Sequence, residues 1–120
     1  MPIIADEAIQ TIDDLDAVKD IYHGINVKLM KCGGISKGKE LIEAAAKQKL
    51  KILLGCMSES SCGIAAAAQL SALTNWTDLD GPLLISNDPF TGVNYSGGKV
   101  LLSDKIGLGV ETELRFENSK

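Results

Sequence analysis

Charged side chains stand at the ends of apolar segments in this 120-residue chain. Asp6 follows the first apolar segment, and Lys28 lies near the end of the second. Asp78 and Asp80 close the fourth, and on a strand two such positions point to the same side, with Cα atoms roughly 6.5–7 Å apart. Two carboxylates at that spacing suit a cation, which could be a substrate ammonium, a lysine or a metal ion.

Lys28 is an unusual residue for its position, because the surrounding segment 25–30 reads INVKLM. Successive side chains of a strand alternate, so Asn26, Lys28 and Met30 point one way while the apolar residues between them point the other. We interpret the side that carries Lys28 as facing a polar opening. A strand-end lysine is also typical of a solvated charge or a salt-bridge partner, and Asp-x-Asp alone often only begins a loop.

The order of the elements explains how these residues could meet. Three helical segments separate four segments with the character of strands, at 2–5, 25–30, 51–54 and 76–80. The helices are predicted to begin at Thr11, at Ser36, and at Ser60 or Ser61, which are all good N-cap residues. Crossover helices of this kind imply parallel strands with right-handed connections. Because parallel strands end at one edge of the sheet, the polar residues are predicted to share that edge.

The C-terminal residues and the composition of the whole chain limit the possible classes of function. Residues 93–102 read as a hairpin, and the residues from 111 onward as a polar tail. A hydrophobic share of 45%, a charged share of 23% and a net charge of −4 are typical of a folded soluble protein and disfavour nucleic-acid binding. We expect neither a signal peptide nor a membrane span, and the odd count of 3 cysteines favours a reducing cytoplasm.

One competing motif lies at residues 33–40, GGISKGKE, which nearly fits the phosphate loop G-x-x-x-x-G-K-[ST]. Glu40 stands where a magnesium-binding hydroxyl is required, and its carboxylate would repel phosphates. The preferred interpretation is therefore a Gly-Gly turn that leads into a helix.

Several motifs together resemble a known family. PIIADE, GINVKLMKCGGI, GCMSESS, GIAAAA and DLDGPLL, followed by GGKV and GLGV, are similar to the C-terminal half of the muconate-lactonising branch of the enolase superfamily. Within that branch they most resemble the dipeptide epimerases of the L-Ala-D/L-Glu type. The resemblance runs from about Pro2 to Val110, and Asp-x-Asp at the last strand is the feature that points to dipeptide epimerases.

The resemblance implies a role for individual residues. Asp6 resembles one carboxylate ligand of an essential magnesium ion, and Lys28 resembles one of two acid/base lysines that flank the substrate α-carbon. Asp78 and Asp80 resemble the pair that holds the α-ammonium of the dipeptide. The turn formed by Cys56, Met57 and Ser58 is expected to line the substrate pocket, whereas no firm role follows for Glu59.

The implied chemistry is removal and return of the proton next to a carboxylate, through an enediolate. Magnesium stabilises the resulting negative charge as a Lewis acid. A lysine serves as the base only when a good fraction of it is neutral, which desolvation and a nearby cation favour. Inversion needs a proton carrier on each side of the carbon, hence two lysines.

A complete barrel of this type takes about 250 residues, so the resemblance implies half of a (β/α) barrel. We expect residues 1–82 to form the half-barrel, residues 83–110 a trailing cap and hairpin segment, and residues 111–120 the tail. The second lysine and two metal ligands are expected upstream, so the chain alone should bind Mg weakly and not turn over dipeptides. A complementing N-terminal half-barrel or a second copy is the expected partner.

Three functional hypotheses remain open on these grounds. The first is the C-terminal half of a magnesium-dependent dipeptide epimerase. The second is a related half-barrel of the muconate or chloromuconate cycloisomerase type or the o-succinylbenzoate synthase type, whose substrates have no ammonium for Asp78 and Asp80. The third is a non-catalytic remnant that only forms oligomers.

Overall fold

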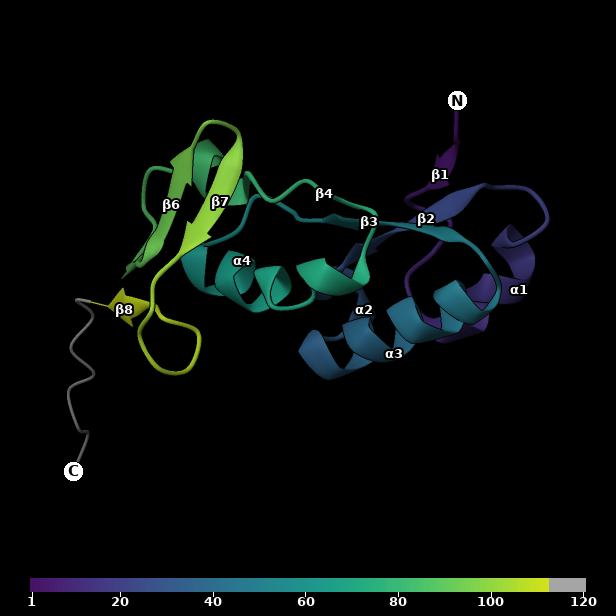
Figure 1. Ribbon diagram of the computed structural model, residues 1–120, viewed down its shortest axis with the longest axis horizontal. Coiled ribbons are helices and arrows are strands. Elements are labelled where there is room, and N and C mark those ends of the chain that lie inside the picture. The colour runs from purple at the N-terminus through teal and green to yellow at the C-terminus, as the bar shows by residue number, and fades with distance from the viewer. Residues whose placement is uncertain (113–120) are drawn as a thin grey trace.

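A single parallel sheet forms the centre of the molecule in this computed structural model, which describes residues 1–112 (Figure 1). Its strands follow one another in sequence order as β1, β2, β3 and β4. Their bounds are Ile4–Ala5, Gly24–Lys28, Lys51–Gly55 and Trp76–Thr77. Every adjacent pair is parallel. The prediction of an α/β half-barrel with four parallel strands is therefore confirmed.

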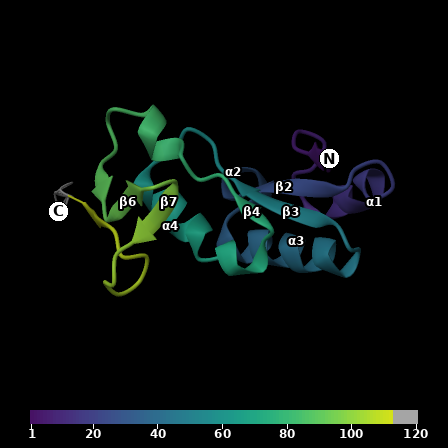
Figure 2. The same ribbon diagram turned by 45° about the horizontal axis from the view of Figure 1, so that its top comes forward.

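Helices cover one side of this sheet, as both views of the ribbon show (Figures 1 and 2). The 3₁₀ helix η1 and helix α1 connect β1 to β2, helices α2 and α3 connect β2 to β3, and helix α4 with the 3₁₀ helix η2 connects β3 to β4. Their bounds are Ile12–Asp14, Leu15–Val18, Leu29–Cys32, Ile35–Lys47, Ser61–Ala68 and Ser71–Leu73. None of the helices within residues 1–112 has the length and apolar character needed to cross a membrane.

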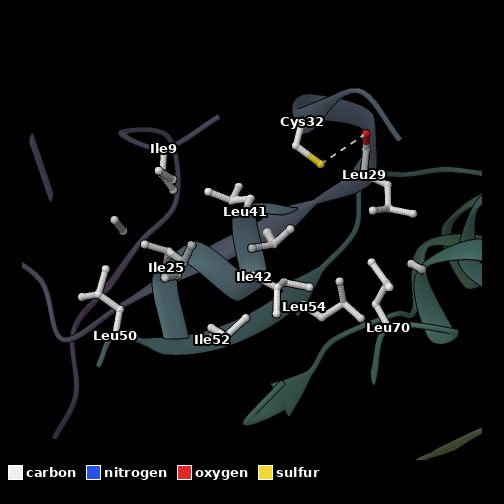
Figure 3. Packing of buried hydrophobic residues seen from close by; sticks show 14 of the residues in the cluster. Ile9, Ile25, Leu29, Cys32, Leu41, Ile42, Leu50, Ile52, Leu54 and Leu70 are labelled. Carbon is white, nitrogen blue, oxygen red and sulfur yellow. Dashed lines mark hydrogen bonds between the residues drawn. The ribbon is translucent and has the colours of Figure 1, made fainter. Parts of the chain in front are cut away.

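The hydrophobic core lies between the sheet and these helices (Figure 3). Ile25 and Val27 on β2 are buried together with Leu54 on β3, and helix α3 contributes Leu41 and Ile42. Because strand side chains alternate, burial of Ile25 and Val27 against the helices directs the side chains of Asn26 and Lys28 to the opposite, uncovered side. Packing against the helices thus fixes the direction of the polar residues.

Strand β2 ends at Lys28, two residues earlier than predicted. Leu29–Cys32 form the short helix α2, whose C-cap Gly33 has the left-handed backbone angle φ 93°. The amide N–H groups of Gly33 and Gly34 both donate to the carbonyl oxygen of Leu29, at 3.2 and 3.0 Å. Glycine adopts this conformation without the steric cost that other residues meet, so the chain can close a helical turn directly after the strand.

Strand β4 is also shorter than predicted, because its paired residues are only Trp76 and Thr77. The amide of Asp78 still donates to the carbonyl oxygen of Leu54 at 2.9 Å, so the backbone stays beside β3 for one more residue. The 3₁₀ helix η3 (Gly81–Leu84) follows, with proline near its start, and this turn prevents further pairing. Asp78 and Asp80 therefore lie just beyond a strand rather than within one.

The predicted helix starts are partly correct. Helix α3 begins at Ile35 with Gly34 in the N-cap position, so the prediction that Ser36 caps it is wrong. Ser60 occupies the N-cap position of α4, as one of the two alternatives proposed. Thr11 precedes the first helical turn, as predicted. The segment 33–40 forms a turn and the start of α3, which confirms the helix interpretation over the phosphate loop.

The trailing segment forms two small antiparallel sheets beside α4. Strands β6 (Val93–Ser96) and β7 (Lys99–Leu102) make the predicted hairpin. Strand β5 (Phe90–Thr91) pairs with β8 (Glu111–Thr112), so the first two residues of the predicted tail belong to a strand. Residues 113–120 of that tail lie outside the described residues.

Replacing Leu54 by alanine should test the core directly. Leu54 has no exposed surface, whereas Leu84 in η3 is 66% exposed. Truncating a fully buried leucine typically costs about 2–5 kcal/mol, because transfer energy is lost and a cavity remains. We expect Leu54→Ala to lower the free energy of unfolding by that amount in urea titrations. Leu84→Ala should change it by less than about 0.5 kcal/mol, and equal effects would contradict the described burial.

Candidate functional site

Asp6 and Lys28 meet at the carboxyl ends of neighbouring strands. Asp6 follows β1 and Lys28 is the last residue of β2. The Lys28 Nζ atom lies 3.0 Å from the Asp6 Oδ2 atom, and the Lys28 side chain is only 12% exposed. The structure thus brings together the two residues that the sequence pattern placed at one edge, and it gives Lys28 an anionic partner on the uncovered side of the sheet.

Lys31 is a member of this group that the sequence pattern did not reveal. Its Nζ atom lies 3.1 Å from Asp6 Oδ1 and 2.8 Å from Glu7 Oε1, and its side chain is 13% exposed. On a continuous strand, residues three apart point to opposite sides, so Lys31 would face away from Lys28. Helix α2 turns the chain after Lys28 and brings Lys31 back to the same carboxylate. The glycine pair at 33–34, which favours a helix end, was the available signal.

The two lysines control the charge of Asp6. Burial acts to raise the pKa of Asp6, but hydrogen bonds and attraction from Lys28 and Lys31 outweigh it and hold the pKa below its usual value. For Lys31, burial acts to lower the pKa, and the bonds to Glu7 and Asp6 raise it above its usual value. At neutral pH the group therefore contains an ionised Asp6 carboxylate beside a Lys31 ammonium group.

The pH dependence of this group has a definite sign. A carboxyl group whose folded-state pKa is lowered stabilises the fold above its unfolded pKa of about 3.9, and this contribution is lost as pH falls through the lowered value. We expect carbon-13 NMR titration of Asp6, in metal-free buffer, to show a midpoint below 3.9, and Lys31→Met to move it upward. Lys37, an exposed lysine paired with Glu40, provides the control Lys37→Met. An unchanged Asp6 midpoint in Lys31→Met would contradict the geometry.

Asp78 and Asp80 lie further along the same edge, and both are exposed. The thiol of Cys56, directly after β3, is 4.0 Å from Asp80 Oδ1. Burial raises the pKa of the Cys56 thiol and the nearby carboxylates add to the rise, so the sulfur is a neutral thiol at neutral pH. Cys56 can therefore form part of a pocket wall but is poorly suited to act as a nucleophile.

The predicted pocket turn after β3 adjoins the aspartate pair. Met57 and Ser58 are exposed in this turn, and the Met57 amide donates to Glu59 Oε1 at 3.0 Å. Gly81 packs so closely on the turn that an added Cβ atom would collide with the Met57 carbonyl oxygen. The segment that carries the aspartates is thus seated against the turn.

The site therefore consists of two groups along one edge. Asp6, Lys28 and Lys31 form one group, and Cys56 and Asp80 belong to the other. The strand order places β3, which Cys56 directly follows, between β2 with Lys28 and β4 with the aspartates beyond it. Neighbouring strands lie about 4.8 Å apart, so the backbones of β2 and β4 are separated by roughly 10 Å. Two extended residues span about 7 Å, so the interval between the groups is large enough for a small extended molecule of that length.

This site provides an incomplete set of ligands for a metal ion. Within residues 1–112, no three histidine, cysteine or acidic side chains lie close enough to hold a metal. Both oxygens of Asp6 contact lysine ammonium groups. Magnesium demands a near-octahedral shell of oxygen ligands. The described residues do not by themselves fit a magnesium ion, and Asp6 can supply only one ligand of a site shared with other residues.

Comparison with known proteins gives the family. A family model described as enolase C-terminal domain-like matches residues 1–115. The chain belongs to this family. The resemblance inferred from the strand-end motifs is therefore confirmed, and the parallel half-barrel is the expected fold of an enolase C-terminal domain-like chain.

Relatives of this enolase C-terminal domain-like chain include epimerases. It is 44% identical over 110 residues to the L-Ala-D/L-Glu epimerase of Bacteroides thetaiotaomicron, covering 92% of this chain and 29% of the relative. It is also 44% identical over 110 residues to the L-Ala-D/L-amino acid epimerase of Flavobacterium johnsoniae, covering 92% and 33%. The chain thus spans about a third of the length of these relatives.

Solved structures agree with this placement. A substrate-liganded complex of the L-Ala-D/L-Glu epimerase from Bacillus subtilis superposes with a TM-score of 0.82 at 35% identity, covering 92% of this chain and 32% of that one. A dipeptide epimerase from Methylococcus capsulatus, complexed with Mg and the dipeptide L-Arg-D-Lys, superposes with a TM-score of 0.81 at 30% identity, covering 89% and 32%.

Proposed function

We propose that this chain is the part of a magnesium-dependent dipeptide epimerase that carries one acid/base lysine, one metal ligand and the ammonium-binding aspartates. The observation that carries the proposal is the 3.0 Å contact between Lys28 and Asp6 at the carboxyl edge of the sheet, with Asp78 and Asp80 further along that edge. Residues 1–82 form the catalytic half-barrel in this proposal, and residues 83–110 form the trailing segment that supports it.

Lys28 is the residue that moves the proton. Its Nζ atom stands on the uncovered side of the sheet, and the covered side is filled by the hydrophobic core. In its neutral form it takes the proton from one side of the substrate α-carbon, and as an ammonium group it returns a proton to that side. Lys28 serves only one side, so inversion needs a second proton carrier from outside the described residues.

Asp78 and Asp80 hold the substrate in place through its ammonium group. Both carboxylates are exposed at the edge, and no lysine ion pair occupies them among residues 1–112. Two anions without such a partner provide a site for the positively charged end of a dipeptide. This feature favours a dipeptide over a muconate or an o-succinylbenzoate precursor, because those substrates lack an ammonium group.

Asp6 contributes one oxygen ligand to the metal site in this proposal. A magnesium ion bound there with ligands from the rest of the protein would stabilise negative charge on the substrate carboxylate.

An experiment that mixes this chain with the complementary part of a relative tests the proposal. We expect the 120-residue chain alone to leave L-Ala-L-Glu unchanged, and a mixture with the preceding two-thirds of the Bacteroides thetaiotaomicron relative to epimerise it in the presence of Mg. That relative's own C-terminal third provides the positive control. A hydrophobic dipeptide is included, because a hydrophobic dipeptide epimerase is 40% identical to this chain.

The outcomes separate the alternatives. No turnover by a folded, associated mixture would contradict the epimerase and favour a non-catalytic remnant. Conversion of a muconate but not of dipeptides would favour a cycloisomerase. Sizing of the chain alone should show self-association, because the outer edges of β1 and β4 have no paired strand within residues 1–112.

A further inference from the structure

The trailing hairpin makes one specific polar contact with the segment that carries the aspartates. The hydroxyl of Tyr95 on β6 donates to the carbonyl oxygen of Leu79 at 2.8 Å. The two residues are 16 positions apart, so this bond links separate parts of the chain. Val93 and Val100 of the hairpin pack against the hydrophobic core, which fixes the strand from which Tyr95 reaches across.

Leu79 is the residue between the two aspartates, and both its side chain and its backbone are held in place. Its side chain is 5% exposed and belongs to the core, and its carbonyl oxygen accepts the Tyr95 bond. The amide N–H of the preceding residue, Asp78, donates to the carbonyl oxygen of Leu54 on β3. With backbone and side chain of Leu79 held, the carboxylates of Asp78 and Asp80 extend from a fixed base.

The turn after β3 holds the other end of the segment 78–81, at Gly81. Gly81 lies directly on the carbonyl oxygen of Met57, with no room for a larger residue. The segment 78–81 is thus clamped between that turn and the Tyr95 hydroxyl. Tyr95, Asp78 and Asp80 also line one pocket of about 670 Å³.

We propose that Tyr95 is a positioning residue for substrate binding: its hydrogen bond to Leu79 sets the direction of the two carboxylates that receive the dipeptide ammonium. This inference rests on the proposed function of Asp78 and Asp80, and it gives the trailing hairpin a role in recognition. Tyr95 does not touch the reacting carbon, so its effect falls on binding and not on proton transfer.

The protonation state of Tyr95 is consistent with this role. Burial raises the pKa of Tyr95 to about 12, and the nearby carboxylates of Asp80 and Asp88 contribute to the rise. The phenol therefore retains its proton at every pH at which the enzyme would work, and the bond to the Leu79 carbonyl persists.

Tyr95→Phe tests the role by removing one oxygen atom. A hydrogen bond is worth about 1 kcal/mol net, which corresponds to about a fivefold change. In the reconstituted mixture we expect KM for L-Ala-L-Glu to rise about fivefold, with kcat changed less than twofold. Tyr22→Phe is the matched control, because no hydrogen bond of the Tyr22 hydroxyl is present within residues 1–112.

A second measurement uses the chain alone. In ¹H–¹⁵N NMR spectra, Tyr95→Phe should shift the amide signals of Leu79 and Asp80, and Tyr22→Phe should leave them in place. A KM within twofold of wild type, or a loss confined to kcat, would overturn the inference. If the mixture has no activity with dipeptides, the proposed function fails, while unshifted amide signals in Tyr95→Phe would overturn the positioning by Tyr95 separately.

Discussion

Lys28→Ala should lower kcat for epimerisation by the reconstituted enzyme about 10³-fold below wild type. A positioned general acid/base contributes about 10²–10⁴-fold, and alanine leaves no group that can carry a proton on that side of the α-carbon. The measurement is the rate of optical inversion of L-Ala-L-Glu by the mixture of the chain with the complementary two-thirds. The control Lys39→Ala removes an exposed lysine that pairs only weakly with Glu43, at 3.7 Å.

Isotope exchange makes the Lys28 prediction sharper. In ²H₂O, a second lysine from the complementary part can still exchange the α-proton of one epimer. Lys28→Ala should therefore lose exchange with the other epimer selectively. Equal loss with both epimers, or a decrease in kcat smaller than about tenfold, would contradict the assignment of Lys28 as a proton carrier.

The double change Asp78→Asn and Asp80→Asn should raise KM for L-Ala-L-Glu by about 100-fold. Hydrogen bonds to charged groups are worth about 1.5–3 kcal/mol, and 2.8 kcal/mol corresponds to about a hundredfold change. Asparagine keeps the shape of each side chain, and both residues are exposed, so the fold should persist. Steady-state kinetics of the mixture measure the effect, and Asp104→Asn in an exposed loop is the control.

A substrate without the ammonium group shows whether the double variant loses recognition of the ammonium group or loses activity in general. N-acetyl-L-Ala-L-Glu presents no positive charge to the two carboxylates. The wild-type mixture should have a lower KM for the free dipeptide than for the acetylated one, and the double variant should lose this difference. If KM rises equally for both substrates, the aspartates do not recognise the ammonium group and the proposed substrate class is wrong.

The strand order and the shared edge could be predicted because their signals are local. Apolar segments alternating with helical ones specify parallel strands, and a parallel sheet has all its carboxyl ends on one side. Asp6 and Lys28 therefore had to lie near each other once the topology was known. Their 3.0 Å contact adds the partner that explains a lysine in an otherwise apolar strand.

Other features depend on contacts that the sequence pattern does not specify. Helix α2 replaces the last residues of the predicted strand because Gly33 permits a left-handed end, and this turn brings Lys31 to Asp6. The bond from Tyr95 to Leu79 depends on how the hairpin packs against the core. A periodic pattern carries no information on such long-range side-chain contacts.

The most direct test of the central claim is a crystal structure of the reconstituted complex with Mg and L-Ala-L-Glu. We predict that the dipeptide ammonium lies within about 3 Å of carboxylate oxygens of Asp78 and Asp80, that Lys28 Nζ faces the α-carbon of the glutamate residue, and that Asp6 ligates the metal. A dipeptide bound away from this edge, or Lys28 still paired with Asp6 and turned from the substrate, would contradict the account.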